Sequence, residues 1–538
     1  MTATYNLSEL FEQVVDVAHD RTALVSGDRR LTYDELDARA NRLAHHLASA
    51  GVGPGDHIGL HLMNGPEYIE GMLAAFKLRA VPVNINYRYV ARELEHLYGM
   101  MDLVGLVVHR RFASDAAGGA QGLADLRTVL VVDDDSGADV PEGWASYEQA
   151  LAAASPERDF TGRTSDDVYC ACTGGTTGMP KGVMWRHEDI FFASMGGGDP
   201  TQFEGPIERA EQLTERVPEQ GLHMLVTPPL MHVSAHWASF QALFGGGKVV
   251  LLPAGSFDPA VAWRLIEQEG AHIAVIVGNA MAAPLIDRYL EDPVDASSLM
   301  AFGSGGAVLS PAVKRRMREA LPNVMVMDGF GSTETGVAGT DSSGAADGKA
   351  TGAVFSMDAN TAVLDDELRP IEPGTDQIGR LARRGHIPLG YYNDPEKTAE
   401  TFVEVDGVRW VLPGDLASVE PDGSIRLHGR GSASINTGGE KVFPEEVESA
   451  LMAHDAVHDV LVVGVPDDRW GERVVAVVQP RAGQDVNFDA LQAHAREHLA
   501  GYKVPRAVVV VDAVVRAPNG KPDYAWAREK ALEDAEAG

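Results

Sequence analysis

A run of glycines and threonines that ends in a lysine is the segment of this sequence best suited to bind phosphate. It reads Thr173-Gly174-Gly175-Thr176-Thr177-Gly178-Met179-Pro180-Lys181-Gly182 and follows a predicted strand, Asp167 to Cys172. Glycines let backbone amides turn toward an anion, hydroxyls add donors, and a lysine adds positive charge. The Walker pattern is absent, because no Gly-Lys-Ser/Thr closes the loop. A plain turn is the alternative, but this density of Gly and Thr directly after a strand favours phosphate binding.

Two further segments strengthen this interpretation. The loop looks like the signature of the superfamily of acyl-CoA synthetases, peptide-synthetase adenylation domains and beetle luciferases. Gly303-Ser304-Gly305-Gly306-Ala307 is similar to the family segment that lines the adenine and acyl pockets. Gly329-Phe330-Gly331-Ser332-Thr333-Glu334 resembles the family's Tyr-Gly-x-Thr-Glu motif, with Phe330 in place of the tyrosine. The resemblance implies an ATP site formed by Thr173, Gly174, Gly175, Thr176, Thr177, Gly178, Lys181, Gly305, Gly306, Ala307, Gly329, Phe330, Gly331, Ser332 and Thr333.

The resemblance also assigns roles to single residues of this site. Thr333 would contact phosphate and Glu334 would hold Mg²⁺, for which one carboxylate with phosphate oxygens and waters is sufficient. Asp415 matches the acid that binds both ribose hydroxyls, and two acceptor oxygens suit a vicinal diol. Arg430 matches an arginine near the ribose and phosphate. Pro413 stands where the family usually has a threonine, so no hydroxyl contact is expected there.

Lys521, in Pro518-Asn519-Gly520-Lys521-Pro522, matches the family's catalytic lysine. Acyl-adenylate formation brings together two anions, a carboxylate and the α-phosphate, so fixed positive charge is the main contribution a protein can make. A solvated loop lysine is the alternative reading. The resemblance further implies a hinge at Ser432 and a thiolation surface at Gly438, Gly439 and Lys441. A rotation about the hinge would exchange this surface for Lys521 and admit coenzyme A.

The substrate is narrowed by one histidine. His232 occupies the place where amino-acid-activating domains carry an aspartate, so no acid is available for an ammonium group. His232 either gates the acyl pocket or is a packed core histidine. Gly278, Gly303 and Gly305 are the other residues expected in the acyl pocket. Small side chains leave volume for a bulky acid. For the small residues of the helix that begins near 278, packing against a neighbouring helix is an equally open explanation. Segments near 184–190, 387–392 and 434–442 look like actinobacterial synthetases for steroid side-chain acids and like synthetases for diterpenoid acids.

Three functions are therefore carried forward. The first is a full acyl-CoA synthetase for a bulky polycyclic or fatty acid. The second is an enzyme that makes acyl-AMP and hands it to a partner enzyme or carrier protein. The third is a non-catalytic binding protein of the same fold, against which the intact Lys181, Glu334, Asp415, Arg430 and Lys521 argue.

These residues need an α/β framework. Apolar runs at 57–62, 129–132, 248–252 and 273–277 alternate with helical patterns, and this alternation predicts parallel sheets. We expect a large multi-lobed domain, 1–430, of mostly parallel sheets with helices plus a distorted barrel. A small mobile α+β domain, 431–538, should follow the hinge, with helices at 444–452 and 488–499 and strands at 460–465, 474–479 and 507–511. Residues 196–222 resemble an inserted lid.

Composition sets the remaining limits. The formal net charge is -33, which repels nucleic acid and anionic membranes and favours solubility. The N-terminus has no signal-peptide pattern, and no apolar run approaches the roughly 20 residues of a membrane helix. The cysteines, Cys170 and Cys172, are too close along a strand for an unstrained disulfide, which fits a reducing cytoplasm. Small-molecule partners are expected, and a homodimer is left open.

Overall fold

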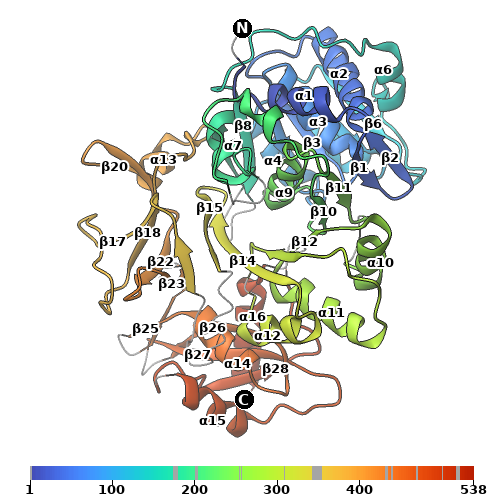
Figure 1. The fold of residues 1–538 in the computed structure, drawn as a ribbon. Helices are drawn as coiled ribbons and strands as arrows, with labels where there is room; N and C mark the ends of the chain where they lie inside the picture. Colours follow the sequence, from blue (N-terminus) through green and yellow to red (C-terminus); the bar gives the residue numbers. More distant parts are fainter. Residues whose placement is uncertain are drawn as a thin grey trace.

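The computed structural model describes residues 3–173, 180–199, 204–253, 255, 257–307, 309–341, 354–430, 434–437, 440–467, 471–499, 501–516 and 521–537. Figure 1 shows the blue N-terminal elements gathered at one end of the molecule and the last elements of the chain, from α14 (Pro444–Met452) to α16 (Tyr524–Ala537), at the other. Along one side lie α13 (Pro395–Thr401), β18 (Gly379–Arg383) and β20 (Phe402–Val405). Among the described residues, every helix falls short of the length and apolar character that crossing a membrane requires.

The N-terminal end contains a parallel five-stranded sheet. Its order is β4 (Val81–Asn84), β3 (His57–His61), β5 (Leu103–His109), β6 (Thr128–Val132) and β7 (Ala145–Ser146). The first four strands are buried along nearly their whole length, as expected for a parallel sheet covered by helices, and the short edge strand β7 is exposed. The helices of this region are α1 (Leu7–Ala18), α2 (Tyr33–Ser49), α3 (Pro66–Lys77), α4 (Ala91–Met100), α5 (Ala113–Ala120) and α6 (Tyr147–Ala153).

A long sheet runs through the middle of the chain. Its first strands are β2 (Arg29–Thr32), β1 (Thr22–Ser26), β11 (Lys248–Leu251), β10 (His223–Val226), β12 (Ile273–Ile276), β13 (Ala301–Ser304) and β14 (Met325–Ser332). The pairs from β1 to β14 are parallel, which confirms the predicted alternation of strands and helices. The helices between them are α9 (Val233–Phe244), α10 (Pro259–Glu269), α11 (Gly278–Glu291) and α12 (Pro311–Ala320). The described part of the expected lid, 196–222, contains α8 (Gln212–Arg216).

The predicted distorted barrel is the part of the fold that needs correction. Among the described residues its strands do not close into a barrel, because they continue the long sheet in antiparallel order. This continuation contains β15 (Gly336–Asp341), β16 (Val354–Met357), β23 (Ile425–Arg430), β22 (Asp415–Val419), β18 (Gly379–Arg383), β21 (Val408–Val411) and β20 (Phe402–Val405), with β17 (Thr361–Leu364) on β18 and α13 (Pro395–Thr401) before β20. The antiparallel pairing of β16 with β23 joins these later strands to the rest of the long sheet.

The C-terminal elements form a separate five-stranded sheet. It contains β25 (Glu440–Val442), β24 (Ile435–Thr437), β27 (Gly471–Pro480), β26 (Val457–Asp467) and β28 (Ala507–Val510), with helices α14 (Pro444–Met452), α15 (Phe488–His498) and α16 (Tyr524–Ala537). Every helix and strand predicted for this part is present. The rings of His428, on β23, and Phe443 lie 5.4 Å apart, so the small lobe packs on the end of the long sheet. The division at 430–431 and the mobility of this lobe stay predictions.

One lysine is buried in the N-terminal core. The side chain of Lys77, at the end of α3, forms ion pairs with Glu12 and with Asp37, the latter at 2.8 Å. Arg163 and Arg158 add a second cation to each carboxylate, and the pKa of both acids is held below its usual range despite burial. This charge cluster ties α1, α2 and α3 together.

We expect Lys77→Met to lower the free energy of unfolding by about 3 kcal/mol, because it leaves two buried carboxylates short of a counter-charge. Urea unfolding at pH 7 measures the change. Lys530→Met is the matched control, since its ion pair with Glu533 is exposed and its loss should leave the free energy of unfolding nearly unchanged. Equal unfolding midpoints for the two variants would contradict a stabilising role for the Lys77 cluster.

Candidate active site

The two strands that flank the predicted phosphate loop pair with each other. Thr173, the last residue of β8 (Val168–Thr173), pairs with Lys181, the first residue of β9 (Lys181–Arg186). Gly174, Gly175, Thr176, Thr177 and Gly178 lie outside the described residues. The strand predicted before the loop is confirmed, and antiparallel pairing holds both ends of the loop at a fixed separation.

Thr333 and Glu334 lie in the tight turn between β14 and β15. The Ser332 amide donates to Thr335 Oγ1 at 2.9 Å, and the Glu334 amide donates to Ser332 Oγ at 3.2 Å. A side chain at Gly331 would meet the Gly336 carbonyl oxygen at 2.0 Å, so the close approach of the two strands requires glycine there. The buried Trp185 indole donates to the Thr333 carbonyl at 3.0 Å and ties this turn to β9.

Tyr391 brings the loop lysine and the turn together. It lies on β19 (Gly390–Tyr391), which pairs with β9, and its hydroxyl donates to Glu334 Oε1 at 3.0 Å. The Lys181 ammonium lies 5.3 Å from the centroid of the same ring. Sequence reasoning missed this residue, because segment 387–392 pointed to a family and to no particular role.

The donor set around Glu334 fits the expected Mg²⁺. A carboxylate oriented by a tyrosine hydroxyl, with a lysine nearby for phosphate, is the arrangement that Mg²⁺ uses together with phosphate oxygens and water.

The expected adenine and acyl segments lie at the carboxyl ends of β13 and β14. Gly303 pairs with Met327, and a side-chain carbon at Gly305 would lie 3.4 Å from the Gly329 carbonyl oxygen, so the two glycine segments are neighbours. A side-chain carbon at Gly303 or Gly306 would meet no described atom within 4 Å, so both face open space. The same edge holds Ala307, the Phe330 ring 4.8 Å from that of Phe355, and Gly278, whose amide donates to Ser304 Oγ at 3.2 Å.

The two residues expected to bind the ribose lie opposite each other on neighbouring strands. Asp415, which begins β22, pairs with Arg430, which ends β23. The backbone therefore brings together two residues that the sequence separates by a whole hairpin. Ser432, Gly438 and Gly439 lie outside the described residues. Lys441 lies on β25, with its backbone opposite Asn436.

Lys521 acts on His232, although the two residues come from different lobes. Burial, followed by the positive charge of Lys521 and smaller effects of His236 and Arg88, lowers the pKa of His232 to about 3. His232 is therefore neutral at pH 7. The small lobe in this structure presents Lys521, itself an exposed side chain, toward the expected acyl site.

His232 differs from His236, one helical turn later, in its hydrogen bonding. His236 contacts Tyr169 at 2.9 Å and the Leu230 carbonyl at 2.5 Å through its two ring nitrogens, so it is a satisfied core histidine. Nε2 of His232 is buried and has no hydrogen-bond partner among the described residues. Nε2 of His61 and of His187, two core histidines, is in the same state, so both readings of His232 stay predictions.

Asn84 is a second residue that sequence reasoning missed. Its amide donates to the carbonyls of Cys172 and Met231, at 2.9 and 2.8 Å, and its carbonyl accepts from the Cys172 amide at 2.7 Å. One buried side chain thus fixes the strand before the phosphate loop relative to the segment that carries His232. A single Asn at the end of a strand offers no pattern that would have revealed this link.

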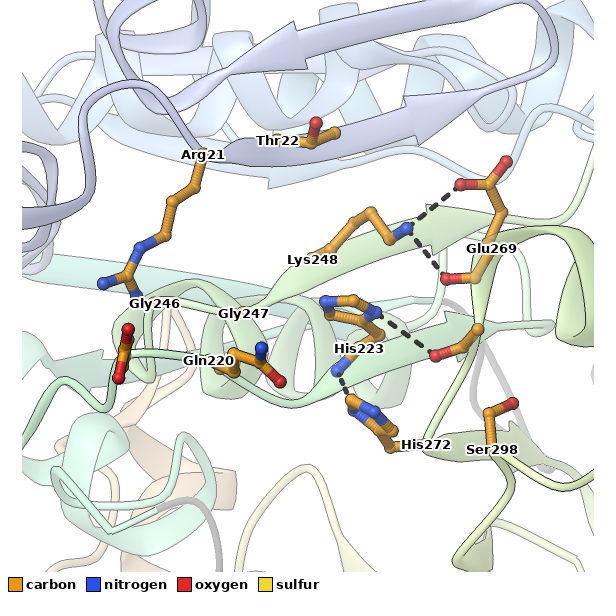
Figure 2. A pocket seen from close by; sticks show the side chains of 13 residues that line it. Arg21, Thr22, Gln220, His223, Gly246, Gly247, Lys248, Glu269, His272 and Ser298 are labelled. Carbon is orange, nitrogen blue, oxygen red and sulfur yellow. Dashed lines mark hydrogen bonds and ion pairs between the residues drawn. The ribbon is translucent and has the colours of Figure 1, made fainter.

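A cavity of about 520 Å³ lies at the opposite edge of the long sheet (Figure 2). His223 and Lys248 are the first residues of β10 and β11, so the cavity is at the amino ends of the parallel strands. Lys248 donates to Glu269 Oε2 at 3.1 Å and to its backbone oxygen at 2.8 Å, and His223 bonds the Gly270 carbonyl and the His272 ring. These side chains satisfy one another, and none of the predicted site residues lines this cavity.

Comparison with known sequences agrees with this geometry. The model of the AMP-binding enzyme family matches residues 11–392, and that of the AMP-binding enzyme C-terminal domain matches residues 446–521. A 3-oxocholest-4-en-26-oate–CoA ligase of Rhodococcus rhodochrous is 46% identical over 532 residues, covering 98% of this chain and 96% of the relative. A medium/long-chain-fatty-acid–CoA/3-oxocholest-4-en-26-oate–CoA ligase of Mycolicibacterium smegmatis is 44% identical over 531 residues, covering 97% and 96%.

Solved structures share the fold. An anthranilate CoA ligase in complex with anthranoyl-AMP superposes with a TM-score of 0.85 at 24% identity, covering 99% of both chains. ATP-bound MatB from Rhodopseudomonas palustris superposes with a TM-score of 0.82 at 24% identity, covering 99% of this chain and 100% of that one. The chain therefore belongs to the AMP-binding enzyme family, as an acid–thiol ligase of the AMP-forming type.

Proposed function

We propose that this ligase activates a bulky hydrophobic carboxylic acid with ATP as acyl-AMP, releases pyrophosphate, and transfers the acyl group to the thiol of coenzyme A. The observation that carries the proposal is the position of Lys521, whose charge reaches the buried His232 from the opposite lobe. A cation directed from a second lobe at the expected acyl site is what a reaction between two anions needs.

The phosphates of ATP would bind to the loop at 173–178 and to Lys181. Glu334, oriented by Tyr391, would hold Mg²⁺, which supplies charge neutralisation for the phosphates. Asp415 would take the ribose hydroxyls, with Arg430 beside it, while Phe330 and the segments at 303–307 and 329–332 would form the adenine site. The proximity of Lys181, Tyr391 and Glu334 supports this arrangement.

In the first half-reaction a carboxylate oxygen attacks the α-phosphorus. The bond from that phosphorus to the bridging oxygen of pyrophosphate breaks, and pyrophosphate leaves with the electron pair. Lys521 would stabilise the negative charge shared by the carboxylate and the α-phosphate. The attacking carboxylate oxygen and the departing pyrophosphate oxygen lie roughly in line through the α-phosphorus. The protein therefore contributes mainly by positioning the reactants and by supplying positive charge.

The acid is proposed from the relatives and from the pocket. The relatives' names specify 3-oxocholest-4-en-26-oate and medium- to long-chain fatty acids. The open space beside Gly303 and the neutral His232 suit an apolar body, because an uncharged imidazole needs no counter-ion. We therefore favour a steroid-type or other polycyclic acid, or a long aliphatic acid.

The second half-reaction would follow rotation of residues 431–538 about Ser432. The thiol attacks the acyl carbonyl, and AMP leaves. Gly438, Gly439 and Lys441 would then face the pantetheine arm, since glycine backbone can approach it closely. Transfer of acyl-AMP to a partner enzyme or carrier protein is the second candidate, because it needs only the Lys521 orientation. The free thiols of Cys170 and Cys172 support a cytoplasmic setting.

A panel of acids tests the proposal directly. Steroid side-chain, diterpenoid, fatty and amino acids should be scored separately for acid-dependent exchange of pyrophosphate into ATP and for CoA thioester formation. We expect both activities with bulky hydrophobic acids and neither with amino acids. Exchange without thioester would select the partner-transfer function, and no exchange with any acid would point to a non-catalytic binding protein.

Lys521→Ala should lower the rate of adenylation by about 100-fold or more, because it removes fixed charge from the transition state. Conversion of a supplied acyl-adenylate to thioester should stay near the wild-type rate. Gly439→Leu should show the reverse pattern. Equal losses in both half-reactions for both variants would sink the two-orientation mechanism.

Tyr391→Phe should raise the Mg²⁺ concentration needed for half-maximal adenylation and slow pyrophosphate exchange about tenfold, because the Glu334 carboxylate loses its orienting hydroxyl. The ring below Lys181 is retained. The matched control is Tyr392→Phe, which removes a hydroxyl that donates to Asp102 at 2.8 Å on the exposed side. Identical Mg²⁺ dependence in the two variants would remove Tyr391 from the site.

A further inference from the structure

Residues on both sides of Lys521 are held by backbone contacts within the small lobe. Arg516 and Pro522 form an isolated antiparallel bridge, which brings the start and end of this segment together. Asp523 then caps α16: its side chain accepts from the Trp526 amide at 2.9 Å, and its carbonyl accepts from the Ala527 amide at 3.0 Å. Lys521 therefore lies directly before a bridge and a helix cap.

An ion pair holds Arg516, the first residue of this bridge. The Arg516 guanidinium donates through two nitrogens to the two oxygens of Asp459, both at 2.6 Å. Asp459 lies on β26, which pairs with β27 along nearly its whole length. A bidentate pair of this kind fixes both distance and orientation.

A chain of hydrogen bonds holds Tyr524, on the other side of Lys521. The Tyr524 hydroxyl, in the first turn of α16, donates to Glu448 Oε2 at 3.3 Å. Glu448 Oε1 accepts from the Val462 amide at 2.8 Å. Glu448 lies on α14 and is only 8% exposed. The chain thus links α16 through α14 to β26, which carries Asp459 as well.

We propose that the Tyr524–Glu448 pair is a positioning device that, with the Arg516–Asp459 ion pair, sets where Lys521 stands relative to the core of the small lobe. The inference rests on the proposed role of Lys521 in adenylation. A lysine on an open loop would sample many positions, whereas adenylation needs the ammonium near one point when the lobe docks. Misplacement by about 1 Å can cost on the order of 100-fold in rate.

Charged groups on three sides decide the state of Glu448. Burial first, and then Glu445 on the same helix, raise the pKa of Glu448 to about 8, while the Val462 amide, Arg516 and Tyr524 act in the opposite direction. Glu448 is therefore a neutral acid at pH 7. Above pH 8 Glu448 becomes a buried anion beside Tyr524, so we expect the position of Tyr524 relative to Glu448 to change in that range.

Tyr524→Phe tests the proposal at the shared hydrogen bond. We expect adenylation to fall about 10-fold in kcat, with the KM for ATP nearly unchanged and thioester formation from supplied acyl-adenylate unaffected. Tyr502→Phe is the control, since this tyrosine of the same lobe is 37% exposed. Wild-type adenylation in Tyr524→Phe would overturn the inference, and so would an equal loss in both half-reactions. Unchanged adenylation in Lys521→Ala would instead overturn the proposed function.

Glu448→Gln tests the same device by pH. Glutamine keeps the oxygen that accepts from Val462 and cannot ionise. We expect the wild-type adenylation profile to bend near pH 8 and the variant to lose this bend, while the thioester half-reaction shows no difference between the two proteins. Profiles that coincide for adenylation would contradict the role of Glu448.

The same variant makes a prediction about stability. The carboxyl group has a pKa of about 8 in the folded protein and about 4.5 otherwise, so folding takes up a proton between these values. Wild-type stability should therefore fall relative to Glu448→Gln as the pH rises from 4.5 to 8, and the difference in Tm should stay constant above that. A difference that is independent of pH would show that Glu448 is ionised in the folded protein.

Discussion

The reaction requires two anions to meet inside a protein whose own formal net charge is -33. Positive charge must therefore be delivered locally and without neutralisation by the surrounding acids. In the proposed mechanism, two lysines supply this charge from two directions. Lys181 begins β9 and lies over the Tyr391 ring, within a rigid three-stranded sheet. Lys521 approaches from the small lobe, and its effect on His232 shows that its charge reaches a site with little water.

The parallel strands explain why the other site residues gather. The carboxyl ends of β13 and β14 lie at one edge of the long sheet, so segments 303–307 and 329–334 become neighbours despite their separation in sequence. The amino ends of the strands form the other edge, where Lys248, Glu269 and the two histidines of Figure 2 satisfy one another. The proposed binding site thus lies at one edge of the sheet, and the charged side chains at the other edge pair with one another.

Much of this could be predicted from the sequence, because motif residues and apolar periodicity are local signals. The strand before the phosphate loop, the parallel alternation, and two helices and three strands of the small lobe were predicted in this way, whereas β24, β25 and α16 were not. Residues that act through long-range contacts could not be. Tyr391 meets Glu334 across 57 positions, and Asn84 joins Cys172 to Met231 across 88 and 147 positions. The barrel prediction failed for the same reason, because strand composition does not reveal that β16 pairs with β23.

The way the small lobe holds Lys521 follows from the charge problem. Any carboxylate used to anchor the lysine could also pair with it and cancel the charge that catalysis needs. Asp459 is matched by the bidentate Arg516, and Glu448 is kept protonated at neutral pH by burial and by Glu445. Both anchors therefore give hydrogen bonds and fixed distances within the small lobe. In the proposed arrangement, an ion pair and a protonated acid thus set the position of Lys521 in a chain rich in acids.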